Sequence, residues 1–590
     1  MQTVSKEWVK NQRDTISPEG FVEVSLRVTD PELELSTKTT TNQQHATLSS
    51  VTNIANRVCD DVPSFVTLEQ NAWALNGARK FVSDGLSAGQ ELAYVSDALC
   101  DDKGSFGSSP PQVIINVNTN PNPIPAITIV WGESTSEYPT TFTIVLTYTD
   151  APQQRIRITD NKSCRSVVDI ADATSGLSRV VVSMNNWCLP NHRARIEGII
   201  LGMDAVFPKT KLLSYTHERV FDPLSTSLPS EKVSFTIDNT DGEYDPFAEH
   251  GISKGLNERQ VLKTRYGNKK SDGSIEWIDG NTAYLSEWSI PTNGISASFV
   301  ARDVLDMLSA PYTDKPLGKL IDCPLELYVD GALIPLITRS VRELMESVVE
   351  SAGVSPDTLV FDDDVPNIPI SAPLPKESCA VCLQLLANAV GMALYIGRDG
   401  RIHVRHRTFT PRSVVDDNTY HLSEYVCYQK PEVTLGKPVG KVIVKFYEYF
   451  AKVKESPVTD EDGNETGTTR TTFELVTNTT DVTVENEGAR GETITLDNPL
   501  VSDNPAVAKS WGEELLQYAN LRRSLEFDWR ADVRLDPLDK VDTKVEWYTD
   551  VLGREQGSLA VDNRDVLMTE LTYSFDGAFR AKGKGRVLNG

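Results

Sequence analysis

The chain has 590 residues, of which 39% are hydrophobic and 24% are charged, and its formal net charge is −25. At roughly 150 residues per domain, this length predicts several domains rather than one core. The charge argues against specific nucleic-acid binding, because phosphate contacts require clustered Lys and Arg.

The sequence predicts a protein made in a cytoplasm and not inserted in a membrane. The N-terminal residues, "MQTVSKEWVKNQRDT", are polar and lack the apolar stretch of a signal peptide. No apolar run reaches about 18 residues, so no membrane-spanning segment is expected. Eight cysteines are too sparse for a disulfide scaffold, and free thiols are expected. A bridge stays open among the four that share one third of the chain, Cys59, Cys100, Cys164 and Cys188.

Five regions of different composition follow one another along the chain. Residues 1–55 contain strands and end in a polar linker, "LSTKTTTNQQHATLSS". Residues 56–205 carry strands at the spacing of a β-sandwich. Residues 206–322 are strands with one short helix, residues 323–430 are α+β, and residues 431–590 are strands with one helix. The pattern predicts a mainly β, multidomain protein with α+β parts.

The few helices are clearly signalled. Segments 340–353 and 378–391 each combine a Ser cap, an apolar face and a terminal Gly. The second segment runs into "MALYIGRDGRIHVR", which predicts a hairpin that turns at Asp399 and Gly400. Pro505 stands at the first position of the last predicted helix.

The stretch "VSFTIDNTDGEYDPF", residues 233–247, is a strand that runs into a dense acidic turn. Its glycine does not fall at the sixth position that an EF-hand loop requires. A looser cation site formed by Asp238, Asp241 and Asp245 stays open, beside the simpler interpretation of a tight turn after a strand.

No catalytic motif is complete. "GISKG" places Ser253 in a G-x-S-x-G pattern, but the strand and helix of a hydrolase elbow are missing around it. Cys379 and Cys382 form C-x-x-C on an apolar helix face, which favours buried thiols. His403 and His406 are spaced for opposite faces of a strand and make a poor metal pair. We expect no enzyme, cofactor or metal, although paired carboxylates that meet only in the fold stay open.

Several stretches resemble the tail hub proteins of long-tailed bacteriophages, which form the baseplate or tail-tip hub. The first is "FDPLSTSLPSEKVSFTIDNTDGEYDPFAEHGISKGLNERQVLKTRYG", and it continues in "TAYLSEWSIPTNGISASFVARDVLDML". Near the end, "WRADVRLDPLDKVDT" and "MTELTYSFDGAFRAKGKGRVL" resemble a strand element and the closing hairpin of that family. The resemblance covers residues 1–50 and about 205–590.

This resemblance implies tail-tube-like β-barrel hub domains. Residues 1–55 and 206–322 would form the first barrel, residues 323–430 an α+β hub domain, and residues 431–590 the second barrel. It also implies a homotrimer in the virion tail tip or baseplate, around the DNA-exit channel. The implied partners are the tail tube or distal tail protein, the tape measure protein, and tail fibre or tip proteins. Carboxylates that line such a channel would repel DNA phosphates.

Residues 56–205 resemble an inserted galactose-binding-like, jelly-roll β-sandwich, on the stretch "NAWALNGARKFV" and the strands after it. Such sandwiches often bind sugars through aromatic rings. The possible glycan contacts are Trp73, Tyr94 and Trp131, although aromatic side chains more often fill a core.

Three functions compete on this evidence. The leading prediction is a structural virion protein, a tail hub that joins the tail tube to the tail tip or central fibre. The alternatives are a host-glycan-binding tail adhesin and a tail-associated cell-wall hydrolase. The hydrolase is disfavoured because catalytic motifs are missing and because "GKGRVLNG" ends the chain directly after the last hub-like hairpin.

Overall fold

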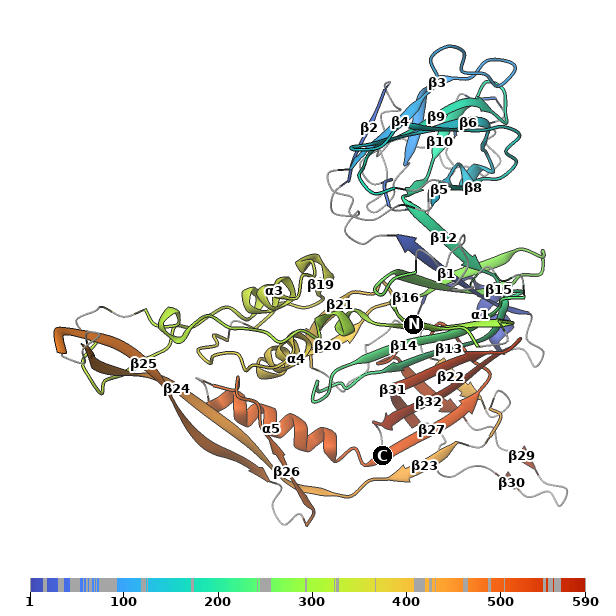
Figure 1. Ribbon diagram of the computed structural model, residues 1–590. Helices are drawn as coiled ribbons and strands as arrows, with labels where there is room; N and C mark the ends of the chain where they lie inside the picture. The colour runs from blue at the N-terminus through green and yellow to red at the C-terminus, as the bar shows by residue number, and fades with distance from the viewer. Residues whose placement is uncertain are drawn as a thin grey trace.

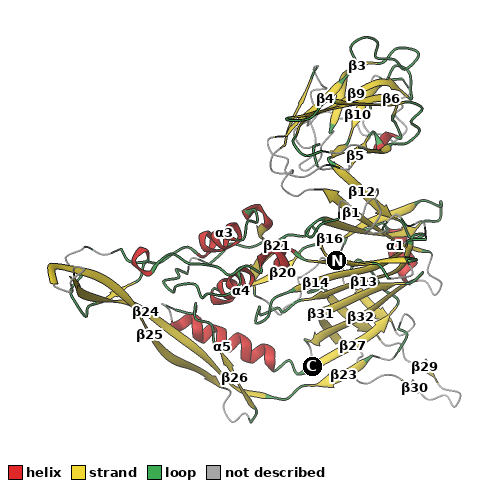
Figure 2. Cartoon of the chain, in the orientation of Figure 1, coloured by secondary structure: helices red, strands yellow, loops and turns green. Residues whose placement is uncertain are grey.

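The computed structural model shows a mainly β protein built from several packed parts (Figure 1, Figure 2). The mainly β, multidomain prediction is therefore confirmed. The structure describes residues 2–13, 19–29, 37–42, 54–56, 58–59, 62, 66–67, 69–70, 72–73, 93–117, 124, 126–170, 174–240, 242, 244, 256–291, 294–322, 324, 328–366, 368–407, 420–423, 427–429, 431–459, 465–485, 490–502, 505–544, 548–549, 555–556 and 564–588.

A 13-stranded sheet forms the centre of the molecule (Figure 1). Its main path runs in the order β12 (Gly202–Phe207), β1 (Gly20–Thr29), β15 (Val261–Lys269), β16 (Ile275–Ser289), β17 (Ser296–Arg302), β14 (Ser230–Asp238), β13 (Leu212–Val220), β31 (Arg564–Phe575), β32 (Phe579–Val587), β27 (Arg523–Trp529) and β23 (Glu432–Leu435). Strand β28 (Lys540–Lys544) pairs with β31 and with β22 (Tyr420–Ser423). The β13–β31 pairing joins strands from the middle and last thirds of the chain.

The alternation of side chains explains why this sheet has a buried face. Alternate residues of β14 are buried, and Phe235 among them stacks on Phe299 of β17 with ring centroids 5.0 Å apart. Trp529 of β27 and Trp8 of helix α1 (Lys6–Arg13) belong to the same core. The strand predicted within residues 233–247 is therefore confirmed, with its apolar residues inward.

A β-sandwich stands apart from the large sheet (Figure 1). One of its sheets has the order β2 (Thr37–Thr41), β4 (Gln112–Val117), β9 (Leu177–Trp187), β6 (Pro139–Tyr148), β7 (Gln154–Ile158). Two smaller sheets are β11 (Gly198–Ile200), β5 (Ala126–Val130), β8 (Arg165–Asp169) and β10 (Arg193–Ile196), β3 (Tyr94–Leu99). A separate core fills them, with Trp131 edge-on to Phe142.

The third part holds most of the helical residues and has its own core. Helices α3 (Val341–Ser351) and α4 (Cys379–Ala389) lie with β19 (Leu359–Phe361), β21 (Ile402–His406) and β20 (Met392–Ile396). Helix α5 (Pro505–Ala519) packs on a long hairpin, β24 (Val439–Thr459) and β25 (Glu465–Glu485), which also carries β18 (Leu333–Pro335) and β26 (Glu492–Leu496). A further short pair joins β29 (Tyr548–Thr549) to β30 (Glu555–Gln556). All three α-helices predicted from capping signals are confirmed.

The sheets are open in the part of the chain that the structure describes, and none closes into the barrel that the resemblance implied. The large sheet ends at β12 on one side and at β23 on the other, and these strands share no backbone pairing. Within the described ranges, no helix is both long and apolar enough to cross a membrane.

Candidate functional site

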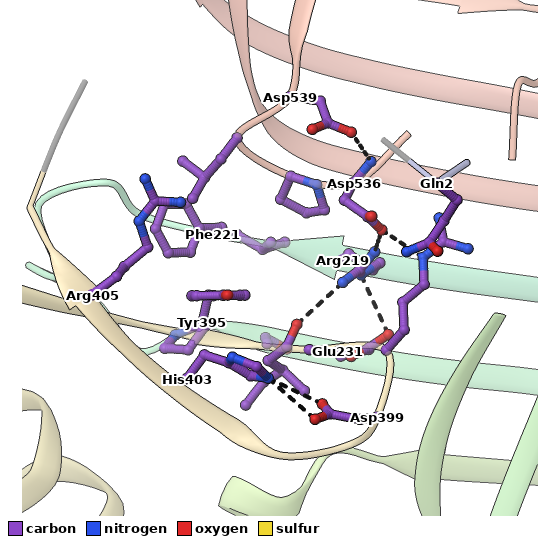
Figure 3. Close-up of a pocket in the computed structure, with 18 residues that line it drawn as sticks. Gln2, Arg219, Phe221, Glu231, Tyr395, Asp399, His403, Arg405, Asp536 and Asp539 are labelled. Atoms are coloured by element: carbon purple, nitrogen blue, oxygen red, sulfur yellow. Dashed lines mark hydrogen bonds and ion pairs between the residues drawn. The ribbon is translucent and has the colours of Figure 1, made fainter. Parts of the chain in front are cut away.

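A half-buried carboxylate, that of Asp536, holds two buried arginines at the junction between the large sheet and the β20–β21 hairpin (Figure 3). Arg398, at the tip of that hairpin, donates from Nε to Oδ1 of Asp536 at 2.7 Å. Arg219, near the end of β13, donates to the same oxygen. Burial alone would raise the pKa of Asp536, but the two guanidinium groups lower it well below its ordinary value.

Backbone carbonyls complete the hydrogen bonding of both guanidinium groups. Arg398 donates to the carbonyl oxygens of Asp279 at 2.5 Å, Val533 at 2.8 Å and Leu535 at 3.2 Å. Arg219 donates to the carbonyl oxygen of Ile396 at 3.1 Å, across the junction in the other direction. Each arginine therefore ties its own element to the facing one.

A chain of buried polar groups leads from this centre into the large sheet. Glu231 of β14 contacts Arg219 at 3.3 Å and His217 at 2.5 Å, both through Oε1. His217 Nδ1 lies 2.8 Å from the hydroxyl of Tyr266, whose pKa burial raises to about 12. Burial lowers the pKa of His217. The second oxygen of Glu231, Oε2, has no hydrogen-bond partner in the described part of the chain.

A histidine and two aspartates flank the same junction. His403 Nδ1 lies 2.9 Å from Asp362, and its Nε2 lies 3.2 Å from Asp399. Burial lowers the pKa of His403, but hydrogen bonds to Asp399 and Asp362 outweigh it and leave the pKa raised. The sequence predicted that His403 and His406 lie on opposite faces of the strand and make a poor metal pair. In the structure the His406 side chain is exposed and takes no part in this cluster. No group of three metal-ligating side chains occurs in the described residues.

A cavity of about 240 Å³ lies between these groups (Figure 3). Its walls come from β13, the start of β14, the β20–β21 hairpin and the loop at residues 536–539. Most of the charged groups that line it are engaged with one another, as the distances above show.

The acidic turn is described only in part. Asp238 ends β14 and accepts a hydrogen bond from the backbone N–H of Thr240 at 2.9 Å. Gly242 has φ of 72°, and its N–H donates to Asn239 at 2.9 Å, which is tight-turn geometry. Asp241 and Asp245 lie outside the described residues, so the cation site at this turn stays a prediction.

The three aromatic residues considered for glycan contact are not equivalent. Tyr94 and Trp131 have no exposed surface and fill the sandwich core, so neither ring can stack on a sugar in this structure. Trp73 is 65% exposed. Of the three residues, only Trp73 therefore presents its ring to solvent.

The remaining motifs do not form reactive sites in the described residues. Cys379 and Cys382 are buried on α4, as expected, and burial raises the pKa of Cys382 to about 11. Cys100, Cys164 and Cys188 are free thiols. Ser253 lies outside the described residues, but the segment after it forms strand β15 rather than a helix.

Sequence reasoning missed the arginine–carboxylate centre. Arg219 and Glu231 occupy core-facing positions, in step with Tyr215 on β13 and with Val233 on β14. In an alternating strand, every second position is expected to be apolar and buried. A charged residue at such a position is the signal that could have identified Arg219 and Glu231. Nothing local pointed to Asp536.

Comparisons with known proteins give matches only among solved structures. No protein-family model and no curated protein matches the chain. The chain is similar to a tail protein from Neisseria meningitidis MC58, with 11% identity, a TM-score of 0.38, and coverage of 65% of this chain and 94% of that one. It is also similar to the 43 kDa tail protein of prophage MuSo2 from Shewanella oneidensis, with 14% identity, a TM-score of 0.36, and coverage of 65% and 95%. A prophage tail protein, gp18, from Listeria monocytogenes EGD-e matches with 9% identity, a TM-score of 0.33, and coverage of 66% and 91%.

Proposed function

We propose that this chain is a structural protein of a long-tailed bacteriophage, a tail hub that joins the tail tube to the tail tip or central fibre. The observation that carries the proposal is the pairing of β13 with β31, from Tyr215 opposite Phe575 to Val220 opposite Glu570. It brings the two regions that resemble hub proteins, which hold β14–β17 and β31–β32, into one sheet. Strands from these two distant regions of the chain therefore lie in one continuous sheet.

The proposal includes the assembly and its partners. Three copies would form a ring in the virion tail tip, around a channel that forms part of the DNA exit. A net charge of −25 supports this role, because an acidic wall repels phosphates and lets DNA pass. The tail tube or distal tail protein, the tape measure protein and the tail fibre or tip proteins would be its partners. The division of the chain at residues 55, 205, 322 and 430 belongs to the same proposal.

The role we propose is structural rather than catalytic. Its support is the junction centre, where Asp536, Arg219 and Arg398 are committed to one another and to backbone carbonyls. Turnover of purified cell wall by the full chain, lost on substitution of one carboxylate, would contradict this part of the proposal.

Electron microscopy of the purified full chain tests the hub function. We expect threefold particles with a central opening. Compact twofold dimers would contradict it. The control variant is Lys38→Glu. Lys38 is exposed on the edge strand β2 of the sandwich, so this substitution should leave the particles unchanged.

A second candidate, glycan binding by the sandwich, is favoured by the way Trp73 is mounted. Glu69 lies just before it, is 1% exposed and holds Arg195 at 2.5 Å. The carbonyl of Gln70 lies 2.6 Å from His192 Nε2. The turn that precedes Trp73 is thus anchored by buried polar contacts, and the Trp73 ring is exposed beside it.

Glycan-array binding by the full chain and by Trp73→Ala tests this second candidate. We expect binding by the wild type that the substitution abolishes, because ring stacking supplies much of the contact area. Trp288→Ala, which removes a 36% exposed tryptophan from the large sheet, is the matched control. Equal signals from all three proteins would remove the candidate.

A further inference from the structure

Two strands that end their sheets carry opposite charges. β7 is the last strand of the five-stranded sandwich sheet, and β25 is the last strand of the hairpin sheet. Arg155 and Arg157 are exposed on β7. Asp481 and Glu485 are exposed at the C-terminal end of β25. No ion pair within 4 Å is formed by these four side chains in the described residues, although Asp481 lies opposite Lys445 and Glu485 opposite Lys441 on the neighbouring strand β24.

The other face of each edge is apolar. On β7, Ile156 and Ile158 alternate with the arginines and pack against the sandwich core. On β25, Val482 and Val484 alternate with the acidic residues and pack against the core below α5. Both edges therefore have one apolar and one charged face, with charges of opposite sign.

We propose that β7 of one copy of this chain pairs with residues 481–485 of β25 in a second copy. A continuous sheet across this contact places Ile beside Val on one face and Arg beside Asp or Glu on the other. Cross-strand pairs of β-branched residues and of opposite charges both stabilise a sheet. Unpaired backbone groups along the two edges supply the hydrogen bonds.

The charges select this pairing over others. Two copies of β7 set against each other would bring Arg155 and Arg157 together, and like charges across strands are destabilising. Charged edge strands oppose indiscriminate pairing in the same way. Only an edge of opposite charge is accepted, and the β25 end provides one.

The contact must form between copies. In one chain the sandwich and the β24–β25 hairpin lie well apart (Figure 1). Contact between two unlike surfaces is head-to-tail, and repetition of a head-to-tail contact gives a ring when the rotation between copies closes and an open filament when it does not. The number of copies in that ring rests on the proposed hub function, whereas the pairing itself does not.

Charge reversal tests the pairing, with the mass of the full-length protein measured by light scattering over a dilution series. The variants are R155E/R157E, D481K/E485K, and a combined variant with all four changes. We expect each double variant to raise the dissociation concentration of the oligomer about tenfold or more, since repulsion replaces attraction at two positions. The combined variant should recover the wild-type value, because the charges are exchanged and complementary again.

Lys38→Glu is the matched control, because Lys38 is exposed on β2, the opposite edge strand of the same sheet as β7. It should leave the oligomer unchanged. All four residues of the test are exposed, but D481K/E485K sets Lys opposite Lys445 and Lys441 of β24, so circular dichroism and denaturant unfolding of each variant must show that the β24–β25 hairpin is intact.

Three outcomes would overturn the pairing: a monomeric wild type, an oligomer indifferent to both double variants, or a combined variant that fails to recover. Threefold particles that persist in both double variants would remove this contact and leave the hub function standing. Dimers that dissociate on reversal and recover in the combined variant would keep the contact and contradict the hub.

Discussion

Asp536 accepts hydrogen bonds from Arg398 and Arg219 on a single carboxylate oxygen, Oδ1, with the Arg398 Nε at 2.7 Å. Arg398 belongs to the β20–β21 hairpin and Arg219 to the large sheet, so one carboxylate joins two parts of the molecule. Both guanidinium groups are more than nine-tenths buried. The loss of either arginine would leave the negative charge of Asp536 with only one positive partner, in a place that water reaches poorly.

Substitution Arg398→Met should therefore destabilise this junction by about 3 kcal/mol, the cost typical of breaking a buried ion pair on one side. Methionine keeps most of the volume and removes the charge and the carbonyl hydrogen bonds. Denaturant unfolding measures the loss, and hydrogen exchange should rise in the β20–β21 hairpin and at residues 533–539.

Arg401→Met is the control for that substitution. Arg401 follows on the same hairpin, is exposed, and donates from Nε to the carbonyl oxygen of Asp357 at 2.9 Å. Its loss should cost about 1 kcal/mol or less. Equal effects of the two substitutions would show that the Asp536 centre contributes nothing specific.

Asp303 gives the stability of the protein a defined pH dependence. It accepts hydrogen bonds from the backbone N–H of Glu231 at 2.6 Å and of Leu305 at 2.9 Å, and burial raises its pKa from 3.8 to about 7. A raised pKa means that the folded state favours the protonated form. The stabilising contribution of this group is therefore full below pH 4 and is lost as the pH rises to about 7.

Relative to Asp303→Asn, the wild type should lose stability between pH 4 and pH 8 by roughly 4 kcal/mol. Asparagine does not ionise, so the difference between the two proteins isolates this carboxyl from the opposite titration of His217. Unfolding free energies at several pH values in that window provide the test. A constant difference between the two proteins would show that Asp303 titrates at its ordinary pKa.

Gly400 allows the hairpin tip to approach the large sheet. Its φ is 76°, and an added Cβ would lie 2.8 Å from the carbonyl oxygen of Thr282. Gly400→Ala should destabilise by about 1 kcal/mol for the backbone conformation and more for the clash. Gly273→Ala is a matched control, since its φ is 86° and its Cβ would meet nothing within 4 Å. A thermal melt of both variants separates the two costs, and equal shifts would contradict the close approach.

Local signals in the sequence predicted the helices well. The Ser378 cap accepts a hydrogen bond from the N–H of Val381, and α5 begins at Pro505 as its position indicated. Capping and periodicity depend on residues within a few positions of one another, so one sequence suffices to reveal them. The inward alternation of β14 was predictable for the same reason.

The junction centre could not be predicted in this way. Arg219, Arg398 and Asp536 become neighbours only when the sheet and the hairpin meet. Arg219 stands out as a charge at a core-facing strand position, but nothing in its segment identifies Arg398 or Asp536 as its neighbours. Burial of Tyr94 and Trp131 has the same origin, because residue type alone does not decide whether an aromatic ring faces a core or solvent. Sequence patterns predict which face of a helix or strand is apolar, but they do not predict which two elements will pack together.

The C-x-x-C pair of α4 should behave as buried thiols rather than as a redox centre. Cys379 and Cys382 have no exposed surface, and burial raises the pKa of Cys382 from 9 to about 11. The thiolate is the reactive form, so this shift alone should slow alkylation of Cys382 about a hundredfold at pH 8. Mass spectrometry after timed iodoacetamide labelling measures the rate at each cysteine.

Cys164, which is only partly buried, should react before Cys379 and Cys382 in the folded protein, and all three should react at similar rates in denaturant. Rapid native labelling of Cys382 would show instead that the start of α4 opens to solvent, and the C-x-x-C pair would then merit a redox titration.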